Sequence, residues 1–221
     1  MLECIEIQTS SIIDASIIWL HGLGADGHDF ESIVDELELP HNVGIRFVFP
    51  HGPIRPVSIN GGMRMRAWYD ISTPDLVSVL DLKGIQESVE AVSALLEREI
   101  SRGVNSKRII LAGFSQGGLI ALHLGPRFVK PLAGVLALST YDPTAVQLVN
   151  ELSAANSNLA VFMAHGTFDP VVNIEQSKLA EQALKAVGLS VQWCSYPMQH
   201  SICAEELRDI STWLSARLEG L

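Results

Sequence analysis

Short apolar segments alternate with amphipathic segments along most of the chain. Residues 2–7 alternate weakly between apolar and polar positions and residues 16–20 form an apolar run, so the chain is predicted to open with two strands. Apolar runs of strand length recur at residues 45–49, 108–112, 133–138, 159–164 and 191–196. These seven segments are the expected strands.

Segments with helical spacing of apolar residues separate these runs. Helices are predicted from Asp29 or Ser32 to about Leu39, over residues 85–100, and over residues 119–124, where Gly125 and Pro126 are expected to end the helix. Further helical segments are expected near residues 143–154, 173–187 and 204–218. Strands that alternate with helices predict an α/β fold, a mainly parallel sheet with helices on both faces. Without an internal repeat or a linker, residues 1–221 are expected to form a single domain.

The exception to this alternation is the segment from Pro50 to about Leu82. Prolines and glycines punctuate it, and no hydrophobic period emerges. A structureless stretch of this length inside a compact domain is usually a functional loop or a misread element. Its second half carries the apolar residues Leu76, Val77, Val79 and Leu80.

Composition and charge narrow the classes of partner. The 221 residues are 48% hydrophobic with a formal net charge of −10, which disfavours nucleic acid and anionic membranes as electrostatic partners. No apolar run is long enough for a membrane span, and no secretory signal is recognisable. Three cysteines without metal-type spacing favour reduced thiols and no metal site. We therefore expect a cytoplasmic protein without integral membrane association.

The chemistry centres on Ser115, within G-F-S-Q-G at residues 113–117. A predicted strand precedes this serine and a predicted helix follows it, as in the nucleophile elbow, where a tight turn forces the serine toward positive φ. Because such a pentapeptide also occurs by chance, the assignment of Ser115 as a nucleophile depends on finding a base and an acid to serve it.

His200 is the expected base. In the elbow topology the chain order is nucleophile, acid and then histidine, each at the carboxyl end of a strand. Beyond the helix after Ser115, only His165 and His200 remain, and His200 lies between the last predicted strand and the last helix. His165 is followed by Gly166 and is interpreted as a structural turn residue.

Asp169 and Asp142 are the two candidates for the acid. Asp169 follows the strand that comes immediately before the one leading to His200, whereas Asp142 precedes Pro143 and also fits a plain helix start. Asp169 is preferred for this reason, under the geometric roles that a triad requires.

Two backbone N–H groups are available for an oxyanion hole. Gln116 follows the nucleophile at a helix N-terminus, and Leu23 lies in the early loop H-G-L-G-A-D-G at residues 21–27. A dinucleotide-binding turn is the alternative interpretation of that loop, but the next strand ends on Phe49 and Pro50 without the acidic residue that binds a ribose. No cofactor is therefore expected.

The sequence resembles the acyl-protein thioesterase and bacterial carboxylesterase branch of the α/β-hydrolases. The matching blocks run in order through nearly the whole chain: L-H-G-L-G-A-D-G-H-D-F at residues 20–30, R-A-W-Y-D at 66–70, G-F-S-Q-G-G at 113–118, H-G-T-F-D-P-V-V at 165–172, and Met198 with His200. The resemblance implies that Ser115, Asp169 and His200 form a triad and that Leu23 and Gln116 donate the oxyanion hole, in agreement with the reasoning from the residues.

The resemblance also implies a substrate class. It predicts a cofactor-free serine carboxylesterase without a large lid domain, acting on short to medium acyl esters and on acyl thioesters; a lysophospholipase and a protein depalmitoylase are the alternatives. The partner would be a small-molecule or lipid acyl ester or an acylated protein. The apolar residues of segment 76–80 then border an acyl-binding groove, or else belong to the core or to a homodimer contact.

Two other function classes remain open at this point. A non-catalytic binding protein could retain the scaffold and lack the triad geometry, in which case Ser115 would not react with a fluorophosphonate. A peptidase would cleave amides in preference to esters. Both alternatives are decided by experiment rather than by the sequence.

Overall fold

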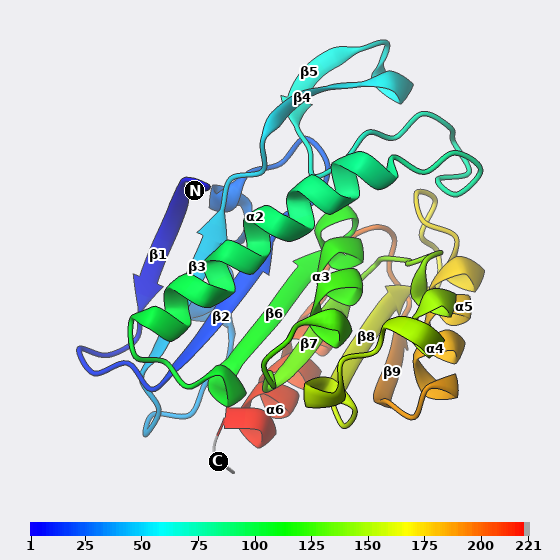
Figure 1. Cartoon of the computed structure of the whole chain (residues 1–221). Coiled ribbons are helices and arrows are strands. Elements are labelled where there is room, and N and C mark those ends of the chain that lie inside the picture. The colour runs from blue at the N-terminus through cyan, green and yellow to red at the C-terminus, as the bar shows by residue number, and fades with distance from the viewer. Residues whose placement is uncertain (219–221) are drawn as a thin grey trace.

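Seven strands form one sheet in the computed structural model, which describes residues 1–218 (Figure 1). Their order is β1-β3-β2-β6-β7-β8-β9, and only β1 runs antiparallel to its neighbour. All seven predicted strands are confirmed, with these bounds: β1 Cys4–Gln8, β2 Ala15–Leu20, β3 Ile45–Pro50, β6 Ile109–Phe114, β7 Gly134–Leu138, β8 Ala160–Gly166 and β9 Ser190–Tyr196.

Helices cover both faces of this sheet, as predicted. The bounds are α1 Ile33–Glu36, α2 Leu82–Ser101, α3 Gln116–Arg127, α4 Leu148–Glu151, α5 Ile174–Ala186 and α6 Ala204–Leu218. In Figure 1, α2 and α3 lie in front of the sheet and α6 lies behind it. Successive residues of a strand point to opposite faces, so Ile18 and Leu20 join the core under α2 and α3, while Ile17 and Trp19 join the core under α6.

Two predicted helices are shorter than expected. The segment from Asp29 to Leu39 contains a 3₁₀ turn, Gly27–Phe30, followed by the four-residue α1, and Asp26 rather than Asp29 or Ser32 caps the first turn by accepting from the N–H of His28. Residues 143–154 likewise break into α4 and 3₁₀ turns at Ala145–Gln147 and Ala154–Asn156. Short amphipathic stretches cover the core without completing several helical turns, because packing rather than propensity stabilises them.

Two predicted helices are longer than expected, since α2 begins at Leu82 rather than Ile85 and α3 continues past Gly125. Helix α3 continues through Gly125 and Pro126 to Arg127. Proline lacks the N–H for one intrahelical bond, and in the last turn this loss does not stop the helix before Phe128. Gly125 is required by packing, because a Cβ there would lie 2.3 Å from Cγ2 of Val135.

Residues 50–82, which were expected to lack regular structure, contain a hairpin. Strands β4 Ile54–Val57 and β5 Met63–Arg66 pair antiparallel as a separate two-stranded sheet, which projects beyond the carboxyl ends of the parallel strands (Figure 1). The connection between β4 and β5 is a 3₁₀ turn, Ser58–Asn60, followed by Gly61 and Gly62 with φ of 66° and 79°. A Gly-Gly pair between two short runs is a hairpin signal, but the prolines at 53 and 56 masked it.

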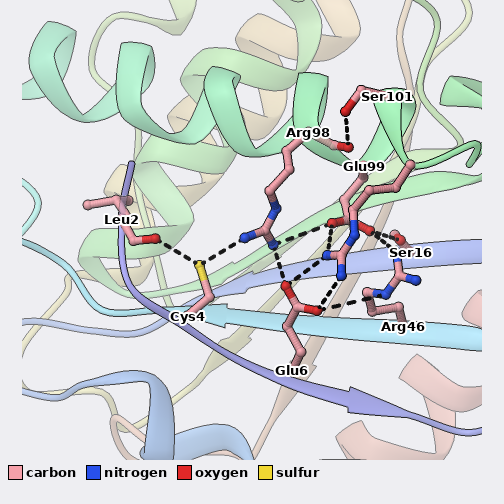
Figure 2. A network of polar contacts seen from close by, with 9 residues as sticks. Leu2, Cys4, Glu6, Ser16, Arg46, Arg98, Glu99 and Ser101 are labelled. Atoms are coloured by element: carbon pink, nitrogen blue, oxygen red, sulfur yellow. Dashed lines mark hydrogen bonds and ion pairs between the residues drawn. The ribbon is translucent and has the colours of Figure 1, made fainter.

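A buried ionic network joins the β1 edge of the sheet to α2, as Figure 2 shows. The fully buried carboxylate of Glu99 accepts from Arg46 Nη1 at 2.8 Å, from Arg102 Nη1 at 3.0 Å and from Ser16 Oγ at 2.7 Å. Burial raises the pKa of Glu99, but these hydrogen bonds outweigh it and hold the pKa below its ordinary value. Glu6 of β1 completes the network with Arg98 and Arg102, each at 2.8 Å.

Candidate active site

Ser115 occupies the turn between β6 and α3 in a strained backbone conformation. Its φ is 53° and its ψ is −118°, a region that residues with a side chain rarely adopt. The Ser115 N–H donates to Leu138 O at 2.9 Å, and Thr140 Oγ1 donates to Ser115 O at 2.6 Å. The turn is thus fixed by the end of the neighbouring strand β7 and by the residues that follow it.

The two glycines around Ser115 are required by close backbone contacts. A Cβ at Gly113 would lie 2.3 Å from Gly117 O, and a Cβ at Gly117 would lie 2.6 Å from the carbonyl oxygens of Leu20 and His21. These distances are too short for any side chain, and the obstructing atoms are backbone. The G-x-S-x-G spacing is therefore a packing requirement of this turn as well as a motif.

Asp169 and His200 are in direct contact. Asp169 Oδ2 lies 2.7 Å from His200 Nδ1, and Asp169 Oδ1 accepts the N–H groups of Val171 at 2.8 Å and Val172 at 2.9 Å. The Asp169 side chain is fully buried, whereas that of His200 is 17% exposed. Because a carboxylate only accepts, Nδ1 carries the proton in the neutral ring and Nε2 is left as the basic nitrogen.

The loops that carry these two residues pack against each other and against the elbow. Phe168 N–H donates to Met198 O at 3.1 Å, and a Cβ at Gly166 would lie 2.4 Å from that same carbonyl oxygen. The His200 ring lies against the ring of Phe114, with centroids 4.8 Å apart, and Phe114 directly precedes Ser115. The fold thus brings the predicted nucleophile, base and acid to one region of the carboxyl edge.

The competing candidates have other partners. His165 is fully buried beneath the acid, with Nε2 2.9 Å from Val172 O and 3.4 Å from Asp169 Oδ2, and burial lowers its pKa. Asp142 accepts from Thr144 N at 2.8 Å and Thr144 Oγ1 at 2.6 Å, and burial raises its pKa to about 6. Within residues 1–218 the contacts of His200 thus favour Asp169 over Asp142.

Of the two predicted oxyanion donors, Gln116 directly follows Ser115 and Leu23 lies in a loop that passes beside it. Gln116 is the first residue of α3, and the first N–H groups of a helix have no partner within the helix. The loop that carries Leu23 passes next to the nucleophile, since a Cβ at Gly22 would lie 3.5 Å from Ser115 Cβ. An anion bound here would also benefit from the positive end of the α3 dipole.

The segment 76–80 partly borders the site and partly packs on the core. Leu76, which has φ of 64°, lines a cavity of about 500 Å³ that also reaches Asp169, and its carbonyl oxygen accepts from Tyr141 Oη at 3.2 Å. Leu76 and Val77 also pack against the core beneath α2 and α3, whereas Val79 is exposed. Leu76 thus packs on the core, and its place beside an acyl-binding groove stays a prediction.

The described part of the chain offers neither a metal cluster nor a membrane span. Within residues 1–218, no group of three histidine, cysteine or acidic side chains is arranged to hold a metal ion. No helix in that part is both long and apolar enough to cross a bilayer. Cys4, Cys194 and Cys203 are free and partly buried.

Trp68 and Tyr69 lie at the site, although the sequence alone assigned them no role. Trp68 and Tyr69 stand out there only as part of the R-A-W-Y-D block, but in the fold they bind the side chain of Gln116. Trp68 N–H donates to Gln116 Oε1 at 2.8 Å, and Gln116 Nε2 donates to Tyr69 O at 2.6 Å. No periodicity predicts this contact, which joins positions 47 and 48 residues apart.

The chain is similar to known hydrolases along nearly its whole length. The model of the phospholipase/carboxylesterase family matches residues 3–218. Acyl-protein thioesterase 1 of Gibberella zeae is 36% identical over 214 residues, covering 92% of this chain and 91% of the relative, and that of Neurospora crassa is 37% identical over 213 residues, covering 92% and 87%.

Solved structures show the same likeness. Arabidopsis thaliana SOBER1 superposes with a TM-score of 0.87 at 31% identity, over 92% of this chain and 99% of that one. Zea mays acyl-protein thioesterase 2 superposes with a TM-score of 0.85 at 28% identity, over 99% and 100% of the two chains.

Proposed function

The chain belongs to the phospholipase/carboxylesterase family of α/β-hydrolases and is an ester-bond hydrolase, and we propose that it works through an acyl-enzyme on Ser115. The observation that carries this proposal is the 2.7 Å contact between Asp169 Oδ2 and His200 Nδ1. The His200 ring also packs on Phe114, the residue before the strained Ser115. The proposed triad is Ser115, His200 and Asp169.

In the proposed mechanism His200 Nε2 takes the proton of the Ser115 hydroxyl as its oxygen attacks the acyl carbonyl. The Leu23 and Gln116 N–H groups hold the negative charge that develops on the carbonyl oxygen. The protonated His200, stabilised by Asp169, then donates its proton to the departing alcohol or thiol. Water repeats the sequence on the acyl-enzyme and releases the carboxylic acid, so no cofactor takes part.

The proposed substrates are short to medium acyl esters and acyl thioesters. Relatives named acyl-protein thioesterase support the thioester, and the apolar Leu76 beside the site supports an acyl chain. Lysophospholipase and protein depalmitoylase activities are the alternatives. We further propose that the chain forms one domain and acts in the cytoplasm, consistent with its three free thiols.

The first experiment replaces the nucleophile. Ser115→Ala should retain the fold and lose about 10³-fold or more in turnover of an activated ester, because the oxyanion hole and binding alone leave only residual catalysis. A fluorophosphonate should label the wild type and not the variant. The matched control is Ser139→Ala, since Ser139 is another buried serine with positive φ at the sheet edge. Near-normal hydrolysis by Ser115→Ala would overturn the triad.

The second experiment identifies the substrate class. Esters and thioesters of graded acyl length, a lysophospholipid and a matched amide compete for the wild-type enzyme, and kcat/KM is measured for each. The proposal predicts ester and thioester cleavage well above amide cleavage. Preference for the amide would instead indicate a peptidase, and no labelling and no turnover at all would indicate a binding protein on this scaffold.

A further inference from the structure

We propose that Trp68 is a positioning residue that fixes the separation of the two oxyanion-hole donors. The inference rests on the proposed function, since it concerns the same site. Trp68 is fully buried and contacts both sides of the hole. Its backbone N–H donates to Gln116 Oε1 at 2.8 Å, and its indole Nε1–H donates to His21 O at 2.8 Å.

On the first side, Trp68 and its neighbour hold the residue that supplies one donor. Gln116 uses both ends of its side-chain amide, accepting from Trp68 N–H and donating to Tyr69 O at 2.6 Å. The Gln116 side chain is buried, so these bonds are not exchanged for water. The first turn of α3, and with it the Gln116 N–H, is therefore tied to the backbone of residues 68 and 69.

On the second side, Trp68 holds the loop that supplies the other donor. His21, whose carbonyl oxygen accepts the indole N–H, lies two residues before Leu23. The His21 ring also holds this loop in place. Its Nε2 accepts from Gly52 N–H at 2.8 Å, and its Nδ1 lies 2.7 Å from Gly22 O. Nδ1 thus carries the proton, and burial lowers the pKa of His21, which favours this neutral form.

The bridging residue is itself held in place. Ser88 Oγ of α2 donates to Trp68 O, and the Trp68 ring packs in the core beneath α2 and α3, 5.1 Å from the His21 ring centroid. The space around it is tight, because a Cβ at Gly52 would lie 3.1 Å from the His21 ring and 3.5 Å from the Trp68 ring. A rigid bridge can set the spacing of the groups at its two ends.

The expected effect is on the transition state more than on substrate binding. Removal of one oxyanion donor costs about 10²–10³-fold in kcat, so displacement of a donor should cost a fraction of this, roughly tenfold. The ground-state carbonyl depends less on these N–H groups than the developing oxyanion does. A purely structural role would instead lower the amount of folded enzyme and leave the kcat of the folded fraction unchanged.

The experiment compares Trp68→Phe with Trp19→Phe in the full chain. Both tryptophans are buried, but the Trp19 indole N–H has no partner within the described residues, so the control loses ring volume and no hydrogen bond. We measure kcat and KM on one activated ester, normalised to active sites by fluorophosphonate titration. We also measure the inhibition constant of a trifluoromethyl ketone, whose adduct with Ser115 carries the oxyanion.

Trp68→Phe is expected to lower kcat about tenfold, leave KM within about twofold, and raise the inhibition constant by a factor similar to the loss in kcat. Trp19→Phe should leave all three close to wild type. Equal kcat and equal inhibition for the two variants would overturn the inference. If the fluorophosphonate does not label the wild type, the proposed function itself is overturned. The failure of the inference and the failure of the proposed function are therefore distinguishable.

A second variant covers the case in which Trp68→Phe does not fold. Gln116→Met keeps the length of the side chain and the backbone N–H but removes both bonds to residues 68 and 69. The same pattern of lower kcat, unchanged KM and weaker ketone inhibition is expected. Wild-type kcat in this variant would overturn the inference.

Discussion

Three non-glycine residues within 1–218 have positive φ: Leu76, Ser115 and Ser139. Ser115 follows β6, Ser139 follows the adjacent strand β7, and Leu76 lines the cavity beside Asp169. Such conformations persist only where surrounding contacts determine them, and they gather at functional sites. At Ser115 those contacts come from Leu138 and from the two glycines around the turn.

Gly117→Ala tests how tightly the elbow is packed. The new Cβ would lie 2.6 Å from the carbonyl oxygens of Leu20 and His21, so the backbone must shift, and we expect a loss of about 2 kcal/mol or more in the free energy of unfolding. Urea unfolding of the variant and the wild type measures this loss in the free energy of unfolding. Gly22→Ala is the control, because its Cβ meets only ordinary contacts at 3.4 Å and 3.5 Å. Equal stability of the two variants would contradict the packing argument.

Asp169→Asn tests the acid. The amide would present an N–H₂ to His200 Nδ1 in place of an acceptor, which favours the wrong tautomer, and kcat should fall about 10⁴-fold while the fold is retained. Active-site kinetics and circular dichroism measure the two effects. Asp142→Asn is the matched control and should keep its activity. A larger kcat loss in the control than in Asp169→Asn would reassign the acid.

Glu206→Gln tests a buried carboxyl outside the site. Burial raises the pKa of Glu206 to about 8 from 4.5, so the folded state holds the proton where the unfolded chain has released it. The stability from this group is complete below pH 4.5 and is lost as the pH rises through 8. A neutral amide avoids that loss, so the stability of the variant relative to the wild type should rise from pH 5 to pH 8, by on the order of 4 kcal/mol. Urea unfolding of the variant and the wild type at pH 5 and pH 8 measures this change. A difference in unfolding free energy that is the same at both pH values would contradict the prediction.

At the scale of elements, the network in Figure 2 attaches the antiparallel edge strand β1 and strand β3 to α2. Glu99→Gln would leave Arg46, whose side chain is 10% exposed, without its full counter-charge, and we expect a loss of about 3 kcal/mol in unfolding free energy. The control is Glu175→Gln, whose pair with Lys178 is largely exposed and should contribute less than about 1 kcal/mol. Similar losses in both variants would contradict a special role for burial.

Elements were predicted well where burial dominates. Strands such as β2 and β6 are buried along nearly their whole length, so an apolar run alone marks them. The β4–β5 hairpin has only one buried strand position and a proline at position 56, and therefore carries no such run. The short α1 and α4 were overestimated because amphipathic spacing indicates a buried face but not where the backbone leaves the helix.

At the scale of the molecule, the sheet order predicts a gradient of local stability. Strand β6 lies in the middle of the seven strands, between β2 and β7, and its residues are almost all buried. The β4–β5 hairpin forms a separate sheet of two strands. Amide hydrogens of β6 should therefore exchange with deuterium slowest and those of the hairpin much faster under native conditions, as mass spectrometry can follow. Slower exchange in the hairpin than in β6 would contradict this arrangement.

The sequence by itself determined the seven strands of the main sheet, the α/β class, the family and the chain order of the candidate nucleophile, acid and base. Local patterns carry that information because burial periodicity and motif spacing are properties of neighbouring residues. Only the tertiary structure decided which acid contacts His200 and which residue bridges Gln116 to the loop of Leu23. Asp142 and Asp169 both follow strands, and the choice between them depends on which loops pack together. The place of Trp68 likewise depends on contacts between segments nearly fifty residues apart, which no local pattern encodes.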